Sequence, residues 1–333
     1  MENQNKDGIT EIAINEIRNM NPINIVCATD NKYVPYCGVM LTSLFENNKE
    51  REVNVYIMID KPLSMKGTEQ LSRLEKQYGQ HIHYCMVDSS FFDKYPIRGE
   101  DKKHLSIVTY YRLFAEELLP KEVKQVLYLD CDIIVDSAIG ELFDMDWTDI
   151  AIGTVPDMCT EWDDYYNRLG YDKSMGYFNA GVALMNLEYW RKHHMAKQCF
   201  EYLVNNYEKL DNNDQDVLNV VMKDLKRNLP VTYNYQIQLQ MPYFFNTFSQ
   251  KMQEDVRNTI SPKIIHYAAE LKPWMAYYYS YPFYKTWQKY KRLSPWRCMP
   301  EQLPKTRKFV AWVKRYLIWP LGIWLKKPEL INV

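Results

Sequence analysis

The chain has 333 residues, 47% of them hydrophobic, which is enough for one large α/β domain with an appendage. Its net charge of −1 gives no overall bias towards nucleic acid, and we expect no nucleic-acid partner. Seven scattered cysteines without a C-x-x-C pair indicate neither a zinc site nor a disulfide framework, so a reducing, cytoplasmic setting is expected.

The first part of the chain alternates short apolar runs with amphipathic segments. Residues 1–21 form a polar extension that lacks the apolar core of a signal peptide. Strands are expected at Ile23–Thr29, Val53–Ile59 and Ile82–Val87, and helices at Pro35–Phe45, Leu63–Tyr78 and Ser106–Leu119. This alternation is typical of β-α-β units in a mostly parallel sheet. Ligands of such sheets bind beyond the carboxyl ends of the strands, where Asp30 and Asp132 lie.

The pattern continues less regularly in the second part. Strands are expected at Val126–Leu129, Ile133–Val135, Ile150–Val155, Phe178–Leu187 and Lys263–Tyr267, and helices at Ile139–Phe143, Glu188–Tyr207 and Asp214–Leu225. Residues 157–175 are polar and aromatic, and we interpret them as a loop over a site. Residues 233–248 show no clear period, so no element is predicted there.

Two aspartates one residue apart, Asp130 and Asp132, follow the apolar run Val126–Leu129. Residues i and i+2 of a strand point the same way, so both carboxylates are expected at the carboxyl edge of the sheet. Two such carboxylates repel each other unless a cation lies between them. A D-x-D sequence taken alone is more often a turn or a helix cap, so its interpretation depends on the other motifs.

The histidine His266 ends the last predicted strand. A lone histidine at a strand end is usually just hydrogen-bonded, but two carboxylates and one imidazole also suit Mn²⁺, with Mg²⁺ as the alternative. The sequence contains neither G-x-x-x-x-G-K-[ST] nor G-x-G-x-x-G. A bound diphosphate must therefore be held by a metal ion and by cationic side chains, and Arg112 and Lys272 are the candidates.

Six blocks with characteristic spacing follow one another along the chain. They are Ala28–Asp30, His104–Arg112, Leu127–Asp132, Phe178–Val182, Asp214–Asp216 and His266–Trp274. Together they resemble glycosyltransferase family 8, whose retaining transferases include bacterial lipopolysaccharide galactosyl- and glucosyltransferases and, more distantly, glycogenin. The resemblance covers about residues 24–274, and six blocks in order are far more specific than any one of them.

The resemblance implies one α/β domain of the GT-A, Rossmann-like type, which binds nucleotide-diphospho-sugars and spans residues 22–281. The implied reaction moves a hexose, galactose or glucose, from a UDP-sugar to a saccharide hydroxyl with retention of configuration. The implied acceptor is a lipid-linked glycan such as lipopolysaccharide core or another surface polysaccharide. A self-glycosylating primer of the glycogenin type and a non-catalytic, membrane-bound scaffold of the same fold remain as alternatives.

The family pattern also assigns roles to individual residues. It implies uridine contacts for Ala28, Asp30 and Tyr33, sugar contacts for Arg112, Asp130, Asn179, Ala180, Asp214 and Gln215, a diphosphate contact for Lys272, an acceptor contact for His104, and a metal site of Asp130, Asp132 and His266. The implied catalytic set is Gln215, Asp214, Arg112 and Asp130. Because the amide of Gln215 is a poor nucleophile, we expect a front-side displacement, with Asp214 and Asp216 as the alternative nucleophiles. Lys32, Cys131 and Ala269 depart from the family pattern, and none of them is a metal ligand.

The C-terminal segment 282–333 is strongly basic, with 12 lysines and arginines and 2 acidic residues. Residues 305–319 place Phe309, Trp312, Val313, Tyr316 and Leu317 on one side of a helix and Arg307, Lys308, Lys314 and Arg315 on the other. A basic, Trp-rich amphipathic helix is typical of proteins that bind anionic membrane surfaces; the alternative is a helix packed on the protein's own core. The longest apolar run, Tyr316–Leu325, is too short to span a bilayer. We therefore expect peripheral association with the inner face of the cytoplasmic membrane.

Overall fold

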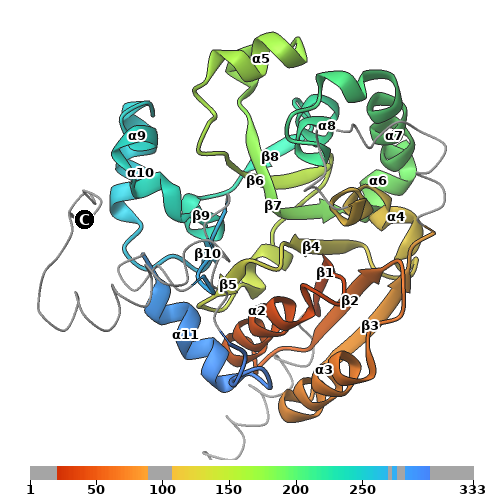
Figure 1. Cartoon of the computed structure of the whole chain (residues 1–333). Coiled ribbons are helices and arrows are strands. Elements are labelled where there is room, and N and C mark those ends of the chain that lie inside the picture. The colour runs from red at the N-terminus through yellow and green to blue at the C-terminus, as the bar shows by residue number, and fades with distance from the viewer. Residues whose placement is uncertain (1–20, 89–106, 269–271, 276–281, 301–333) are drawn as a thin grey trace, which may run out of the picture.

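The computed structural model describes residues 21–88, 107–268, 272–275 and 282–300, which form two sheets with helices around them (Figure 1). The strands are β1 (Ile23–Ala28), β2 (Val53–Ile59), β3 (His81–Met86), β4 (Gln125–Leu129), β5 (Ile133–Val135), β6 (Ile152–Pro156), β7 (Phe178–Asn186), β8 (Lys226–Asn228), β9 (Tyr235–Gln236) and β10 (Ile264–His266). The larger sheet has the order β3-β2-β1-β4-β7-β6-β8, and the smaller has the order β5-β10-β9. In the larger sheet β7 runs antiparallel to both of its neighbours, and the other pairs are parallel. The mostly parallel α/β fold expected from the sequence is confirmed.

Helices cover both faces of the larger sheet (Figure 1). The α-helices are α2 (Val34–Asn47), α3 (Met65–Tyr78), α4 (Ala115–Leu118), α5 (Asp163–Leu169), α6 (Leu187–His193), α7 (Met195–Asn206), α8 (Asp214–Val221), α9 (Pro242–Phe245), α10 (Gln250–Asn258) and α11 (Tyr284–Leu293). The 3₁₀ helices are η3 (Ile107–Phe114), η4 (Gly140–Phe143), η5 (Lys173–Met175), η6 (Tyr207–Lys209), η7 (Val231–Tyr233) and η8 (Ile237–Gln240). One apolar cluster joins the sheet to α2 and α3, and another joins its opposite face to η3, α6, α7 and α8.

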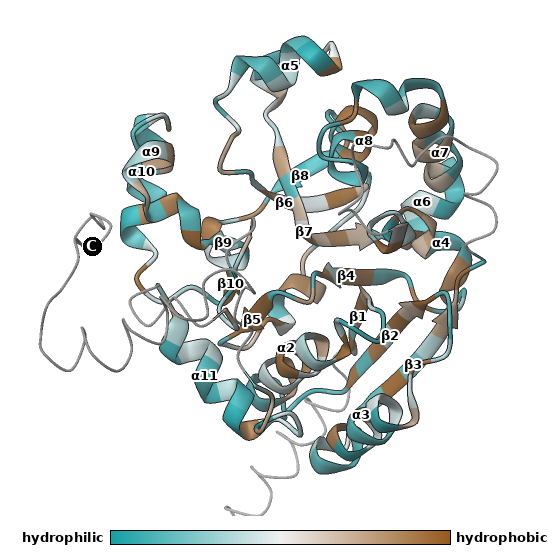
Figure 2. Cartoon of the chain, viewed as in Figure 1, coloured by the Kyte–Doolittle hydropathy of each residue, from teal (hydrophilic) through white to brown (hydrophobic). Residues whose placement is uncertain are grey.

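The central strands are apolar on both faces because both faces are covered. In β1, Ile25 and Cys27 pack on the side of α2, whereas Val26 and Ala28 pack on the side of η3. Such strands read as continuous apolar runs, and Figure 2 shows this as brown ribbon through the middle of the sheet. The edge strand β3 is largely exposed instead. The middle of the sheet is therefore apolar core, and polar residues lie at the carboxyl ends of its strands.

Three predicted helices differ from the structure, and the shortest, Ile139–Phe143, is the 3₁₀ helix η4. The expected helix at Ser106–Leu119 is a 3₁₀ helix, η3, followed by the single turn α4, because β-branched and aromatic residues such as Ile107 and Tyr110 form α-helices poorly. The expected long helix Glu188–Tyr207 is two helices, α6 and α7. They meet at His194, whose φ of 53° is left-handed, a conformation in which histidine is enriched.

The prediction of a loop at residues 157–175 is wrong in part, because α5 lies within it. Its first turn contains Asp163 and Asp164, and Gly170 ends it in the left-handed conformation, so both helix signals are present in the sequence. Strand β8 and helices α9 and α10 were not predicted. Helix α10 follows an N-cap at Ser249, whose hydroxyl accepts a hydrogen bond from the Met252 N–H.

The beginning of the basic C-terminal segment packs on the domain. Helix α11 contacts α2, and Trp287 and Tyr290 are buried in a small cluster beneath it. Trp296 lies so close to Gly38 of α2 that a Cβ there would be 1.9 Å from its ring. The predicted helix 305–319 and residues 1–20 lie outside the described residues. None of the helices within the described ranges is long and apolar enough to cross a bilayer.

Candidate active site

The D-x-D sequence connects the two sheets. The Asp130 N–H donates to the Gly181 carbonyl at 2.9 Å, which extends the pairing of β4 with β7 by one residue. The Asp132 carbonyl accepts from the Tyr267 N–H at 3.0 Å, just after β10. Both aspartates lie in the turn between β4 and β5 rather than within a strand. The backbone contacts, and not strand alternation alone, therefore turn the two carboxylates towards β10.

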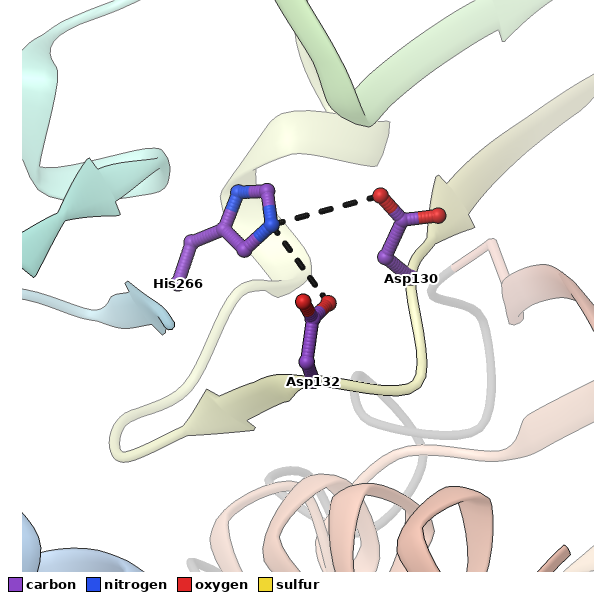
Figure 3. Close-up of side chains that lie close together, drawn as sticks. All are labelled: Asp130, Asp132 and His266. Carbon is purple, nitrogen blue, oxygen red and sulfur yellow. Dashed lines mark ion pairs between the residues drawn. The ribbon is translucent and has the colours of Figure 1, made fainter. Parts of the chain in front are cut away.

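Asp130, Asp132 and His266 converge as the sequence predicted (Figure 3). The His266 Nε2 atom lies 3.4 Å from Asp132 Oδ1 and 4.0 Å from Asp130 Oδ2. Within the described ranges, the potential ligand atoms of these three side chains all lie within 4.8 Å of one another. Two carboxylates and one imidazole form a candidate site for a divalent cation.

Hydrogen bonds fix which nitrogen of His266 faces the carboxylates. Asn234 Nδ2 donates to Asn179 Oδ1 at 2.9 Å, so the other end of the Asn234 amide, Oδ1, is an acceptor. His266 Nδ1 lies 3.0 Å from this oxygen and carries the proton that it accepts. Nε2 is left with its lone pair directed at Asp130 and Asp132. A metal-binding histidine is commonly oriented by its second nitrogen in this way, so the residues fit a metal ion.

Gly181 leaves the space that the site occupies. A Cβ at this position would lie 2.2 Å from His266 Cε1 and 2.7 Å from Asp130 Oδ2. Any side chain here would displace two of the three candidate ligands. The sequence presented Gly181 only as one member of the block Phe178–Val182 and gave no sign of this steric role.

Arg112 is buried between two carboxylates. Its Nη2 lies 2.9 Å from Asp130 Oδ1, its Nε lies 2.8 Å from Asp214 Oδ2, and its Nη1 donates to the Ala180 carbonyl at 2.6 Å. The guanidinium also stacks 3.9 Å from the centroid of the Tyr128 ring. Burial alone would lower its pKa, but Asp130 and Asp214 raise the pKa of Arg112 above its usual range. Arg112 therefore holds a permanent positive charge beside Asp130.

The acidic groups around this charge differ in their proton affinity. Burial raises the pKa of Asp214 to about 6, and the opposing effects of Arg112 and of the Thr109 hydroxyl are smaller. Burial would raise the pKa of Asp132 too, but the Lys272 ammonium holds it well below its usual range. The Lys272 ammonium contacts the Asp132 carboxylate and donates to the Tyr267 carbonyl at 2.9 Å. A second cation thus lies at the candidate metal site.

Gln215, like Arg112, contacts the backbone of Ala180. Its Oε1 accepts from the Ala180 N–H at 3.0 Å, and its Nε2 donates to Asp157 Oδ2 at 3.3 Å. The same carboxylate accepts from Asn179 Nδ2 at 2.9 Å. The structure therefore brings Asn179, Ala180, Asp214 and Gln215 together around β7 and α8.

Asp157 belongs to this group, and sequence reasoning missed it. Its side chain is buried, and desolvation raises its pKa above the usual range for a carboxyl despite three hydrogen bonds. It follows the end of β6, so the rule that ligands lie beyond the carboxyl ends of strands applied to Asp157 as much as to Asp30. The interpretation of residues 157–175 as a loop obscured that signal.

Ala28, Asp30 and Tyr33 lie at the carboxyl end of β1 and at the entry to α2. Asp30 Oδ1 accepts from the backbone N–H groups of Lys32 at 2.9 Å and of Tyr33 at 2.8 Å. The Ala28 carbonyl accepts from Cys131 Sγ at 3.3 Å, so the residue inside the D-x-D sequence contacts this end of β1. Tyr33 is 37% exposed and packs edge-on against Trp274, with ring centroids 6.5 Å apart. His104 and Ala269 lie outside the described residues.

Comparison with known proteins identifies the family to which this chain belongs. Residues 24–277 match the sequence pattern described as Glycosyl transferase family 8. The chain belongs to this family. It is thus a glycosyltransferase of family 8, and the resemblance carried by the six sequence blocks is confirmed.

Three similar proteins illustrate how far the likeness extends. The chain is 26% identical over 258 residues to General stress protein A of Bacillus subtilis, a match that covers 76% of this chain and 87% of that one. It is 28% identical over 287 residues to Lipopolysaccharide 1,2-glucosyltransferase of Escherichia coli, covering 83% and 80% of the two chains. The crystal structure of the galactosyltransferase LgtC with donor and acceptor sugar analogues matches with a TM-score of 0.71 and 25% identity. That match covers 86% of this chain and 99% of the other.

Proposed function

We propose that this protein transfers galactose or glucose from a UDP-sugar to a saccharide hydroxyl and retains the anomeric configuration. One observation carries the proposal: two carboxylates and an oriented imidazole converge beside two cationic side chains, Arg112 and Lys272. A site of this kind suits a diphosphate, which brings negative charge that needs both a metal ion and cations. Membership of family 8 supports sugar transfer, and the similarity to a glucosyltransferase and a galactosyltransferase supports a hexose.

Asp130, Asp132 and His266 are the residues that would hold the cation, for which we propose Mn²⁺, with Mg²⁺ as a substitute. Mn²⁺ accepts a nitrogen ligand more readily than Mg²⁺ does, and His266 supplies one. When bound, the ion supplies positive charge that stabilises the departing UDP. Lys272, which already lies on the Asp132 carboxylate, adds charge on the same side.

The remaining side chains divide between nucleotide and sugar. Ala28, Asp30 and Tyr33 are assigned to the uridine, since they lie at the carboxyl end of β1 and at the entry to α2. Arg112, Asn179, Ala180, Asp214 and Gln215 are assigned to the donor sugar, and His104 is assigned to the acceptor. Arg112 contacts both Asp130 and Asp214, so it links the candidate metal site to the proposed sugar pocket.

Retention is proposed to occur by front-side displacement. The bond between the anomeric carbon and the phosphate oxygen breaks while the acceptor oxygen bonds to the same face of the sugar. The acceptor proton passes to the departing phosphate oxygen, so no protein nucleophile is required. Gln215 is placed beside the anomeric carbon, where its amide can stabilise charge without attacking. Its contacts with Ala180 and Asp157 support a fixed position for that amide.

The acceptor is proposed to be lipid-linked, such as lipopolysaccharide core or another surface glycan. The similarity to a lipopolysaccharide 1,2-glucosyltransferase supports this choice. The basic segment 282–333 is proposed to place the enzyme peripherally on the inner face of the cytoplasmic membrane. Its net charge of +10 and its five tryptophans support attraction to an anionic surface.

A panel of UDP-hexoses tests the proposal. Purified enzyme should release UDP from UDP-galactose or UDP-glucose in the presence of Mn²⁺, and excess chelator should stop the release. The intact mass of the enzyme should stay unchanged during incubation, whereas a self-glycosylating primer would gain hexose units. If no nucleotide sugar in the panel were consumed and none bound in titration calorimetry, the assignment as an active transferase would be wrong.

A further inference from the structure

The side-chain amide of Gln215 has a partner for each of its polar atoms. Besides the bonds with Ala180 and Asp157, its Nε2 donates to the Tyr177 hydroxyl at 3.2 Å. A flipped amide would direct its NH₂ group at the Ala180 N–H and its oxygen at the Asp157 carboxylate, and both contacts would be repulsive. The three partners therefore fix which way the amide faces. Gln215 itself remains half-buried between the buried residues Asp214 and Asp216.

The Tyr177 hydroxyl accepts from Gln215 because its own proton is used elsewhere. It donates to Asp216 Oδ1 at 2.6 Å, and it also accepts from Asn212 Nδ2 at 3.1 Å. A hydroxyl has one proton and two lone pairs, so this oxygen is fully used. The ring is 1% exposed and packs on Tyr165, with centroids 4.7 Å apart. Burial raises the pKa of Tyr177 well above its usual range, which keeps the hydroxyl protonated.

The Asp216 carboxylate is buried and fully engaged. Its Oδ2 accepts from Arg168 Nη1 at 2.7 Å and from the backbone N–H groups of Asp211 and Asn212 at 2.8 and 2.9 Å. Its Oδ1 takes the Tyr177 hydroxyl. Residues two apart on a helix do not share a face, so Asp216 points away from the side on which Asp214 meets Arg112. An oxygen held in this way is not available for attack on a sugar.

We propose that Tyr177 is a positioning residue for the transfer reaction, in which its hydroxyl, oriented by Asp216, sets the face that Gln215 presents to the donor sugar. The inference rests on the proposed function, which places Gln215 beside the anomeric carbon. Asp216 acts through Tyr177 and Arg168 and is not a nucleophile, in contrast to the alternative that its place in the block Asp214–Asp216 had left open. Arg168 belongs to α5, so the same carboxylate also ties α5 to α8.

Tyr177→Phe tests the inference because it keeps the packed ring and removes the hydroxyl alone. It should lower kcat by about tenfold, as expected for one lost positioning hydrogen bond, and leave KM for the donor unchanged. In a Gln215→Ala background the same substitution should have no further effect on kcat. Tyr290→Phe is the matched control, since the buried Tyr290 hydroxyl also contacts an aspartate, Asp136, and accepts from an amide, Asn47 Nδ2, at 2.7 Å. Its kcat should equal that of the wild type.

A second measurement does not depend on activity. The side-chain NH₂ resonances of Gln215 in ¹⁵N-labelled enzyme should shift in Tyr177→Phe and stay in place in Tyr290→Phe. Unchanged Gln215 resonances, or an equal loss of kcat with and without Gln215, would overturn the positioning role. An enzyme inactive towards every UDP-sugar would refute the proposed function instead, and the resonances would still decide whether Tyr177 orients Gln215.

Discussion

The substitution Gly181→Ala tests the candidate metal site through steric fit, because it adds one methyl group and removes no ligand. The added Cβ would lie 2.2 Å from His266 Cε1 and 2.7 Å from Asp130 Oδ2, whereas ordinary contact begins at 3.4 Å. The imidazole must therefore move by about 1 Å, and a displacement of this size at a reacting centre costs on the order of 100-fold in rate. Disturbing the support of a metal ligand lowers metal affinity by about 10- to 100-fold.

Titration calorimetry with Mn²⁺ and the rate of UDP release from a UDP-hexose measure the two effects separately. We expect both losses, and part of the rate should return at high Mn²⁺ concentration because the ligands are displaced and not removed. Gly67→Ala is the control. Gly67 lies in helix α3, and a Cβ there would meet Ser64 Oγ at 3.3 Å and Val34 Cγ1 at 3.4 Å. Gly181→Ala with unchanged Mn²⁺ affinity and rate would refute the assignment of His266 as a ligand.

Three further changes test the metal site, the buried arginine and the C-terminal segment. Asp132→Asn removes one negative charge from the candidate metal site and should lower turnover by at least about 100-fold. Full activity of this variant in excess chelator would refute the assignment of Asp132 as a metal ligand. Arg112→Ala leaves Asp130 and the buried Asp214 without their shared cation, so it should lower the free energy of unfolding in urea by about 3 kcal/mol. It should also impair sugar transfer more than UDP binding. An unchanged unfolding midpoint would show that the ion pair between Arg112 and Asp214 is not buried as described. Truncation after Pro300, which spares the packed helix α11, should abolish sedimentation with anionic vesicles and keep UDP-sugar hydrolysis; vesicle binding that survives would move the membrane contact to the remaining domain.

The sequence predicted the strands well where local pattern and burial agree. Strands β1, β2 and β4 are buried on both faces, so their apolar runs are visible without knowledge of the fold. The break at His194 was not predictable in the same way, because a left-handed residue is set by how α6 and α7 pack and not by the local sequence. Strand β8 carries Lys226 and Arg227 at the edge of the sheet, and its pairing with β6 overrides an unfavourable local sequence.

For the site, sequence reasoning identified the charged side chains and missed the residues that position them. Asp130, Asp132 and His266 stood out as possible ligands, and the structure brings them together. Asn234 and Gly181 did not stand out, because one acts by orienting a nitrogen and the other by lacking a side chain. The roles of Asn234 and Gly181 depend on contacts that form only when β7, β10 and the turn after β4 come together, so the local sequence does not predict them.

¹H NMR of the sugar released from UDP-α-galactose and UDP-α-glucose tests metal-dependent hexose transfer with retention of configuration. With Mn²⁺ present, we expect that one of these donors is hydrolysed by water and that the α-hexose appears first, before mutarotation mixes the anomers. The Asp132→Asn enzyme should release hexose at least about 100-fold more slowly under the same conditions. Initial release of the β-hexose would show that configuration is not retained, and equal rates with and without Mn²⁺ would show that transfer does not depend on the metal ion.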